Sequence, residues 1–118
     1  MMHSRSLLEA RENLFRALAD GTRLEILELL AREGAKNVSE LCQMLGREQN
    51  LISHHLACLK NCGLVQVTEK GRFSIYQIRN RNVLKLLGLA DRHVAGVLND
   101  VLSCIVVSKR QPAVARTV

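Results

Sequence analysis

The chain has 118 residues, and its 17 Lys and Arg residues outnumber its 11 Asp and Glu residues, which gives a formal net charge of +6 at pH 7. A chain of this length is expected to bury a core of its own, and small basic domains often bury further surface by dimerising. The positive charge favours nucleic acid as a partner, whereas one Tyr, two Phe and no Trp argue against a stacking platform for single strands.

No apolar run approaches the roughly 18 residues that a membrane-spanning helix needs. The start of the chain, MMHSRSLLEARE, lacks the apolar centre of a signal peptide. We therefore expect a cytoplasmic protein without a membrane partner. Because thiols stay reduced in that compartment, the four cysteines are interpreted as buried apolar residues, metal ligands or redox sensors.

Two helices are predicted at the start of the chain. Apolar residues recur at helical spacing from Leu7 to Leu18, which predicts a helix that ends near residue 19. Asp20 is the expected N-cap of a second helix, and Gly34 is expected to cap its end in the left-handed conformation. The predicted buried stripe of this second helix consists of Leu24, Leu27, Leu30 and Ala31.

Two more helices are predicted over residues 39–45 and 49–61, and glycines at 46 and 63 should end them. Within the fourth helix, the residues expected to face inward are Ile52, His55, Leu56 and Leu59. The segment LVQVTEKGRFSIYQI then alternates on both sides of Lys70 and Gly71, which predicts a β-hairpin with a basic tip.

The helical pattern resumes near residue 82 and continues to Ile105. This last helix is unusually apolar for an end segment, so we expect much of it to pack against a second copy of the chain. Residues 1–108 are expected to form one DNA-binding and dimerisation domain, and residues 109–118, which have no periodicity, a disordered tail.

The predicted fold is mainly α with a β-hairpin, in the order of a winged helix-turn-helix. A helix fits the major groove of double-stranded DNA, and a basic hairpin tip can reach the neighbouring backbone. Amide and hydroxyl side chains on the exposed face of the fourth helix can bond base edges, and basic side chains suit phosphates. The candidate DNA-contacting residues are Arg47, Gln49, Asn50, Ser53, His54, Lys60, Lys70 and Arg72. The alternative is a winged helix that binds proteins and no DNA.

Four segments resemble successive motifs of the ArsR/SmtB metalloregulators over about residues 12–107: LFRALADGTRLEILELL, VSELCQMLG, QNLISHHLACLKNCGLV and GRFSIYQI. The sequence SxHL, which begins at Ser53, followed by GLV from Gly63, is specific to this resemblance. One departure is Gly21, where the family commonly has proline. The resemblance implies a homodimer through the first and last helices that represses its operator until an inducer binds. It also implies that His55 is structural.

Cys58 and Cys62 are four residues apart, which places both on one face of the fourth helix. Thiolates are preferred ligands of soft cations such as Cd(II), Pb(II) or Zn(II), although two ligands are rarely enough. The pair resembles the recognition-helix cysteines of the family's cadmium- and lead-sensing members. That resemblance implies a third thiolate from the C-terminal region of the other subunit, and Cys104 is its counterpart here.

A second candidate metal site lies in the last predicted helix, where Asp91, His93 and Cys104 resemble the family's interfacial zinc-type site. Eleven residues separate His93 from Cys104, which is about 16 Å along a helix axis. One ion can therefore bind both side chains only across an antiparallel pair of helices in a dimer. The family usually has His where Cys104 stands and Glu or His where Val107 stands, so this site offers at most three ligands.

Cys42 occupies the first cysteine position of the ELCVCDL motif of arsenic and cadmium sensors, but Met44 replaces the second cysteine. That metal site is therefore incomplete. Cys42 is interpreted either as a buried apolar residue or as a redox-active thiol that pairs with a cysteine across the dimer.

The sequence thus predicts a metal-responsive repressor that binds operator DNA as a homodimer and leaves it when a soft divalent ion is bound. The nearest alternative is a repressor of the same fold that senses oxidation, persulfide or arsenite through these thiols. An enzyme is disfavoured, because catalysis by Cys and His needs a nucleophile beside an oriented base in a pocket. Here both residue types lie on a helix that is better explained as a DNA reader.

Overall fold

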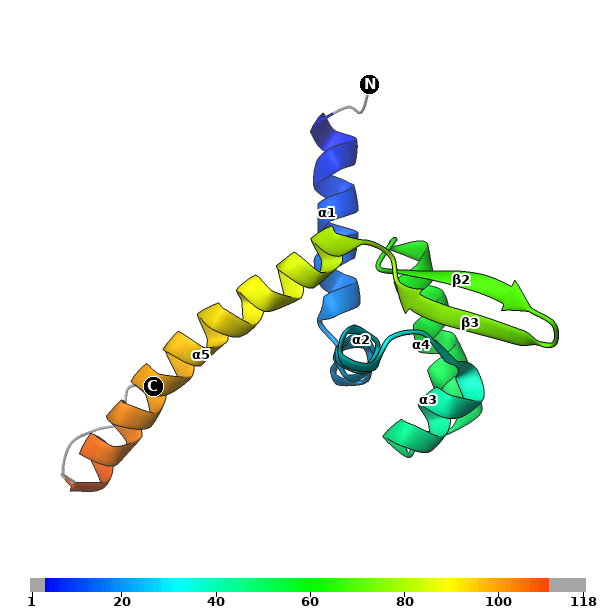
Figure 1. Cartoon of the computed structure of the whole chain (residues 1–118). Helices are drawn as coiled ribbons and strands as arrows, with labels where there is room; N and C mark the ends of the chain where they lie inside the picture. Colours follow the sequence, from blue (N-terminus) through cyan, green and yellow to red (C-terminus); the bar gives the residue numbers. More distant parts are fainter. Residues whose placement is uncertain (1–3, 111–118) are drawn as a thin grey trace. The chain divides into compact units, whose positions relative to one another are not determined.

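The computed structural model of the chain describes residues 4–110, and the surroundings of side chains for residues 5–104. Within these residues the helices are α1 (Ser4–Leu18), α2 (Gly21–Glu33), α3 (Val38–Leu45), α4 (Gln49–Asn61) and α5 (Arg81–Arg110), and the strands are β1 (Lys36–Asn37), β2 (Val65–Lys70) and β3 (Phe73–Ile78) (Figure 1). The prediction of a mainly helical chain with one hairpin is confirmed. The chain divides into two compact units, Met1–Val83 and Leu84–Val118.

Both ends of α2 lie where they were predicted, but the conformation of its C-cap differs from the prediction. The Asp20 side chain accepts a hydrogen bond from the backbone N–H of Arg23 at 3.0 Å, as an N-cap should. Gly34 has φ +88° and ψ −165°, so the prediction of a left-handed cap was wrong. This extended region at positive φ is essentially restricted to glycine, and it leads the chain directly into β1. The Gly34 N–H still donates to the Leu30 carbonyl at 2.9 Å.

The buried face of α2 is broader than predicted. Its buried residues are Ile26, Leu27, Leu29 and Leu30, whereas Leu24 is 43% exposed and Ala31 is also exposed. Contacts with α1, α3, α4 and β3 explain the difference, because a helix packed on several sides buries more than one stripe of residues. Half of the predicted stripe of α2 was therefore wrong.

The strand β1 was not predicted, since two residues are too few to show alternation. It pairs antiparallel with β3 through Lys36 opposite Tyr76 and Asn37 opposite Ile75, which gives the sheet order β1-β3-β2. Asn37 also begins α3 through a capping box with Glu40, in which each side chain accepts the other residue's backbone N–H. This box begins α3 one residue before the predicted start.

The predicted hairpin is confirmed, with β2 and β3 joined by Gly71 and Arg72. Lys70 pairs with Phe73 across the turn. Gly71 has φ +59° and Arg72 does not have a positive φ, which fits a type II′ turn with glycine first. Figure 1 shows β2 and β3 side by side and joined by this turn.

The core of the first unit lies among α2, α3, α4 and the sheet. Its fully buried large side chains are Ile26, Leu27, Leu41, Ile52, Leu56, Leu59, Leu64 and Val65. All four residues predicted to face inward on α4 are buried, including His55. In the second unit, by contrast, every residue of α5 from 89 to 100 is exposed.

No helix within residues 4–110 combines the length and the apolarity needed to cross a bilayer. Of the tail expected at 109–118, residues 109 and 110 belong to α5, and residues 111–118 lie outside the described residues.

Replacement of Leu56 by alanine should lower the free energy of unfolding by about 2–5 kcal/mol, because it leaves a cavity at a fully buried position. Urea unfolding at one fixed protein concentration measures this loss. The matched control on the same helix is Leu51→Ala, where the side chain is 38% exposed, and it should cost no more than about 1 kcal/mol. Equal losses would contradict the assignment of the buried face of α4.

Candidate functional site

The exposed face of α4 carries the side chains expected to contact bases. Gln49, Asn50, Ser53 and His54 are all exposed, opposite the buried side chains that pack α4 into the core. They occupy the first half of the helix, which is the end that enters the groove in helix-turn-helix proteins. The arrangement therefore presents amide, hydroxyl and imidazole groups to a partner at one end of α4.

The predicted phosphate contacts are distributed over three places. Lys60 is exposed near the end of α4, and Lys70 and Arg72 are exposed at the tip of the hairpin. Arg47, in the link before α4, makes an ion pair with Glu25 of α2 at 3.1 Å. Because both of these side chains remain about half exposed, Arg47 is held near the start of α4 and still accessible.

The structure brings Gln49 and Arg72 together around one hollow of about 290 Å³, where the starts of α3 and α4 meet the hairpin. Ser39 and Ser74 line the same hollow, and neither was among the predicted DNA-contacting residues. The sequence offered one signal for Ser39, since it stands inside the Asn37 to Glu40 capping box at the start of α3. The Ser74 hydroxyl donates to the Glu69 carboxylate at 2.9 Å. The exposed Ser39 hydroxyl is therefore the one that extends the surface that a phosphate backbone would meet.

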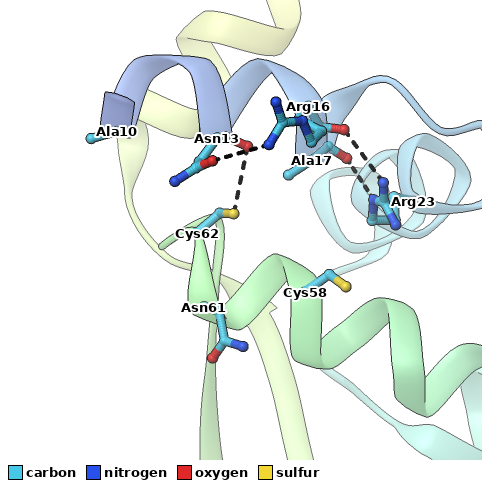
Figure 2. A pocket seen from close by; sticks show the side chains of 8 residues that line it. All are labelled: Ala10, Asn13, Arg16, Ala17, Arg23, Cys58, Asn61 and Cys62. Carbon is cyan, nitrogen blue, oxygen red and sulfur yellow. Dashed lines mark hydrogen bonds between the residues drawn. The ribbon is translucent and has the colours of Figure 1, made fainter. Parts of the chain in front are cut away.

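Cys58 of α4 and Cys62, the C-cap of the same helix, line a pocket of about 490 Å³ between α1, α2 and α4. Figure 2 shows this pocket, which is lined by Ala10, Asn13, Arg16, Ala17, Arg23, Cys58, Asn61 and Cys62. Both thiols are half-buried. The residues of α1 were not predicted here, because their proximity to α4 arises only from the packing of helices that are distant in sequence.

Each of the two thiols has a different neighbour. Cys62 Sγ donates a hydrogen bond to the backbone carbonyl of Asn13 in α1 at 3.7 Å, and Figure 2 shows its sulfur directed to α1. Cys58 Sγ lies 4.0 Å from His54 Nε2 one turn earlier on α4. Over the described part of the chain, no three His, Cys, Asp or Glu side chains are gathered closely enough to hold a metal ion. A site at these cysteines would therefore need a further ligand.

Arg23 joins the three helices that form the pocket. Its Nε donates to the Ala17 carbonyl of α1 at 2.7 Å, and a terminal nitrogen lies 3.1 Å from His55 Nδ1 on α4. Since a guanidinium can only donate, His55 Nδ1 must accept, and the neutral ring carries its proton on Nε2. The Nδ1 atom of His55 therefore accepts a hydrogen bond from Arg23 within the fold. This agrees with the structural role that the resemblance implied.

Burial of the imidazole lowers the pKa of His55 below its usual value of 6.5, and the Asp20 carboxylate partly opposes this shift. The hydrogen bond from the Arg23 backbone N–H lowers the pKa of Asp20. His55 and Asp20 lie 3.8 Å apart (Nδ1 to Oδ2). The two groups therefore favour a neutral imidazole beside a charged carboxylate at neutral pH.

The remaining candidate ligands belong to α3 and α5. Asp91 and His93 are exposed on α5, and residues two apart on a helix do not face each other. Cys104 is exposed, and the side chain of Val107 lies outside the described residues. Cys42 is half-buried on α3. The second candidate site and the redox role of Cys42 stay predictions.

Comparison with known proteins gives a consistent match. Residues 20–67 match the profile of a family described as "Bacterial regulatory protein, arsR family". The chain is similar to the HTH-type transcriptional regulator CmtR of Mycobacterium tuberculosis, with 38% identity over 107 residues. The aligned residues make up 90% of this chain and 80% of that protein. It is 33% identical over 99 residues to the arsenical resistance operon repressor of Bacillus subtilis, which covers 84% of each.

The fold is similar to a solved structure from Mycobacterium bovis, the homodimeric winged helix-turn-helix DNA-binding domain Mb0332, described as a possible ArsR-family transcriptional regulator. The TM-score is 0.77 at 31% sequence identity, over 82% of this chain and 89% of that one. The predicted winged helix-turn-helix fold is therefore confirmed.

The pH dependence of stability should reflect His55. Because its pKa is lowered in the folded state, the unfolded chain binds a proton more readily, and the free energy of unfolding should fall as pH decreases through 6.5. Urea unfolding between about pH 7 and about pH 5 measures the slope, which should be flatter in His55→Gln. Asp20→Asn should steepen it, since the carboxylate raises the pKa of His55. A steeper slope in His55→Gln would contradict the assignment.

Proposed function

Because the chain belongs to the arsR family of bacterial regulatory proteins, we propose that it represses transcription as a homodimer on operator DNA and that a soft divalent metal ion releases it. The family consists of transcriptional regulators, so the chain is a regulator of winged helix-turn-helix fold and not an enzyme. The observation that carries the proposal is that α4 has both an exposed polar face and two thiols in a pocket.

In the proposed complex the first half of α4 enters the major groove. Gln49, Asn50 and Ser53 offer donors and acceptors for base edges. Lys70 and Arg72, at the exposed tip of the hairpin, contact phosphates beside the groove. The net charge of +6 supports binding to a polyanion.

The exposed apolar side chains of α1 and α5 support a homodimer. In a single chain they are between 46% and 59% exposed: Leu7, Leu8, Phe15, Leu89, Val94, Val97, Leu98 and Leu102. Burial of side chains of this kind stabilises association by about 25 cal/mol per Å² of apolar surface removed from water. The similar domain from Mycobacterium bovis is described as homodimeric, which is consistent with this use of the two helices.

The residues proposed to hold the inducing ion are Cys58 and Cys62, with Cys104 from a second copy of the chain as the third ligand. Thiolates suit Cd(II), Pb(II) and Zn(II), and the two thiols of α4 are half-buried beside a pocket rather than packed in the core. The need for a further ligand follows from the described residues, in which no group of three candidate ligands occurs.

Deprotonation of Cys62 connects ion binding to the position of α4. The Cys62 thiol donates to the Asn13 carbonyl, whereas a thiolate has no proton to donate. Loss of this contact weakens the connection between α1 and α4, so the two helices can shift against each other. A coupling of about 3 kcal/mol between ion and DNA binding would weaken DNA binding on the order of a hundredfold.

An anaerobic titration with Cd(II) tests the proposal. Fully reduced protein is first bound to a labelled promoter fragment from its genome, and Cd(II) is then added. The protein should dissociate from the DNA over the same range of Cd(II) concentrations in which the thiolate-to-metal absorbance appears. Cys58→Ser and Cys62→Ser should lose this release, and Cys42→Ser, which changes a half-buried thiol of α3, should keep it. Release that is unchanged in both α4 variants would contradict the metal site.

A salt titration tests the hairpin tip. Lys70→Ala and Arg72→Ala should each weaken binding to all DNA sequences alike, and each should reduce the slope of log affinity against log salt by roughly 0.9. Anisotropy of the same fragment at several salt concentrations measures this slope. Arg32→Ala, which removes an exposed arginine already paired with Glu28, is the matched control. A slope unchanged by both tip variants would mean that the hairpin does not contact phosphate.

Arsenite or an oxidant is the second candidate inducer. The reacting groups would be the same two half-buried thiols that line the pocket. The similar protein from Bacillus subtilis is named as an arsenical resistance operon repressor. DNA release by arsenite, peroxide or a persulfide donor, without any response to Cd(II), would favour this candidate over the metal switch.

A further inference from the structure

The helix α1 is joined to the rest of the first unit by little apolar packing. Of residues 5–18 of α1, only Ala17 is buried. Where α1 approaches α4, the two helices border the pocket of about 490 Å³ rather than a layer of packed side chains. A pocket supplies no dispersion contacts across it. The position of α4 relative to α1 therefore depends on the polar contacts at their junction.

Arg23 of α2 makes the first of these contacts, at the end of α1. The last carbonyl groups of a helix have no partner within it and carry partial negative charge, so a cation is favourable there. Arg23 Nε donates to the Ala17 carbonyl at 2.7 Å, and a terminal nitrogen donates to the Arg16 carbonyl at 3.4 Å. Figure 2 shows both bonds. The guanidinium thus caps α1 from the next helix.

The same guanidinium also reaches the middle of α4. Its other terminal nitrogen lies 3.1 Å from Nδ1 of the buried His55. Asp20 lies 3.8 Å from the same ring nitrogen and accepts the backbone N–H of Arg23. The contact between the Cys62 thiol and α1 is longer, at 3.7 Å, and a thiol is a weak donor. The planar guanidinium, whose donor directions are fixed, is therefore the rigid part of the junction.

We propose that Arg23 is a positioning residue for operator recognition and determines which spacing of half-sites the homodimer accepts. The inference rests on the proposed function, since it requires two chains on one operator. Three of the apolar side chains proposed to form the dimer contact, Leu7, Leu8 and Phe15, belong to α1. A rigid connection from α1 to α4 therefore fixes each reading helix relative to the dimer contact. Helix-turn-helix dimers read half-sites about 34–36 Å apart, and the protein's own geometry sets this spacing.

A looser junction changes recognition in a specific way. Reading helices held at one separation bind one spacing well and other spacings poorly, whereas mobile reading helices must be ordered when they bind. One inserted base pair moves the half-sites roughly 3.4 Å further apart and rotates them by roughly a tenth of a turn. Loss of the Arg23 contact should therefore weaken binding at the natural spacing and reduce the penalty for the insertion.

The spacing ratio of the reduced full-length protein tests the inference. This ratio is the Kd for an operator with one base pair inserted at its centre, divided by the Kd for the natural operator, which footprinting locates on the promoter fragment. Arg23→Lys keeps the charge but cannot place donors at both acceptors, so it should lower the ratio roughly tenfold, the factor that a hydrogen bond to a charged group contributes. The matched control is Arg32→Lys on the exposed face of α2, which should leave the ratio unchanged.

A double-mutant cycle with His55 distinguishes positioning from general destabilisation. His55→Leu removes the acceptor and keeps an apolar side chain at the buried position, so it should lower the ratio as Arg23→Lys does. The double variant should show no further decrease, because both changes act on one bond. His55→Asn, whose amide oxygen accepts a hydrogen bond, should keep part of the ratio. Binding to an unrelated duplex should be unchanged in every variant, since none alters the formal charge at neutral pH.

Three outcomes would contradict the inference. A ratio unchanged in Arg23→Lys, or additive effects in the double variant, would overturn it. Equal binding of both spacings by the wild type would also overturn it and would leave operator binding intact. Absence of any promoter binding by the wild type would contradict the proposed function, and the inference would fail with it.

Discussion

The hydrogen bonds of the Arg23 guanidinium connect α1, α2 and α4, and the packing of these three helices depends on them. The guanidinium donates to the Ala17 carbonyl at the end of α1 and to His55 Nδ1 on α4, while Asp20 caps the helix that carries it. Arginine remains charged at every accessible pH and can only donate, so these bonds do not depend on protonation of the guanidinium. The position of α4 relative to α1 is therefore determined at the same junction that lines the thiol pocket.

This junction positions the helix for which two roles are proposed, DNA reading and ion binding. One face of α4 is buried in the core. The exposed polar side chains lie in the first half of the helix, and the two thiols lie near its C-terminal end. An ion bound by Cys62 would remove the contact of this thiol with Asn13 in α1. In the proposed mechanism, ion binding therefore affects DNA binding through the packing of α4 against α1.

Within the described residues, the two thiols have no third ligand beside them. The apolar side chains of α1 and α5 likewise have no partner surface that buries them. Two thiols on one helix do not satisfy a soft cation, and the apolar side chains of α1 and α5 are about half exposed. In the proposed homodimer, a second copy of the chain would bury the apolar side chains and supply Cys104 as the third ligand. Ion binding and dimerisation are then parts of one equilibrium, which is the physical requirement for a coupled response.

The sequence by itself determined the order and type of the long elements, because helical and strand periods are local. It therefore predicted that Ile52, His55 and Leu56 face inward, and that the hairpin turns after Lys70. Only the tertiary structure decided which elements meet. Packing accounts for the pairing of β1 with β3 and for the broader buried face of α2. The structure also gives Gly34 an extended conformation at positive φ, and it brings Cys62 into contact with Asn13. Local spacing determines which way a side chain faces, but its partner depends on packing between segments that are distant in the chain.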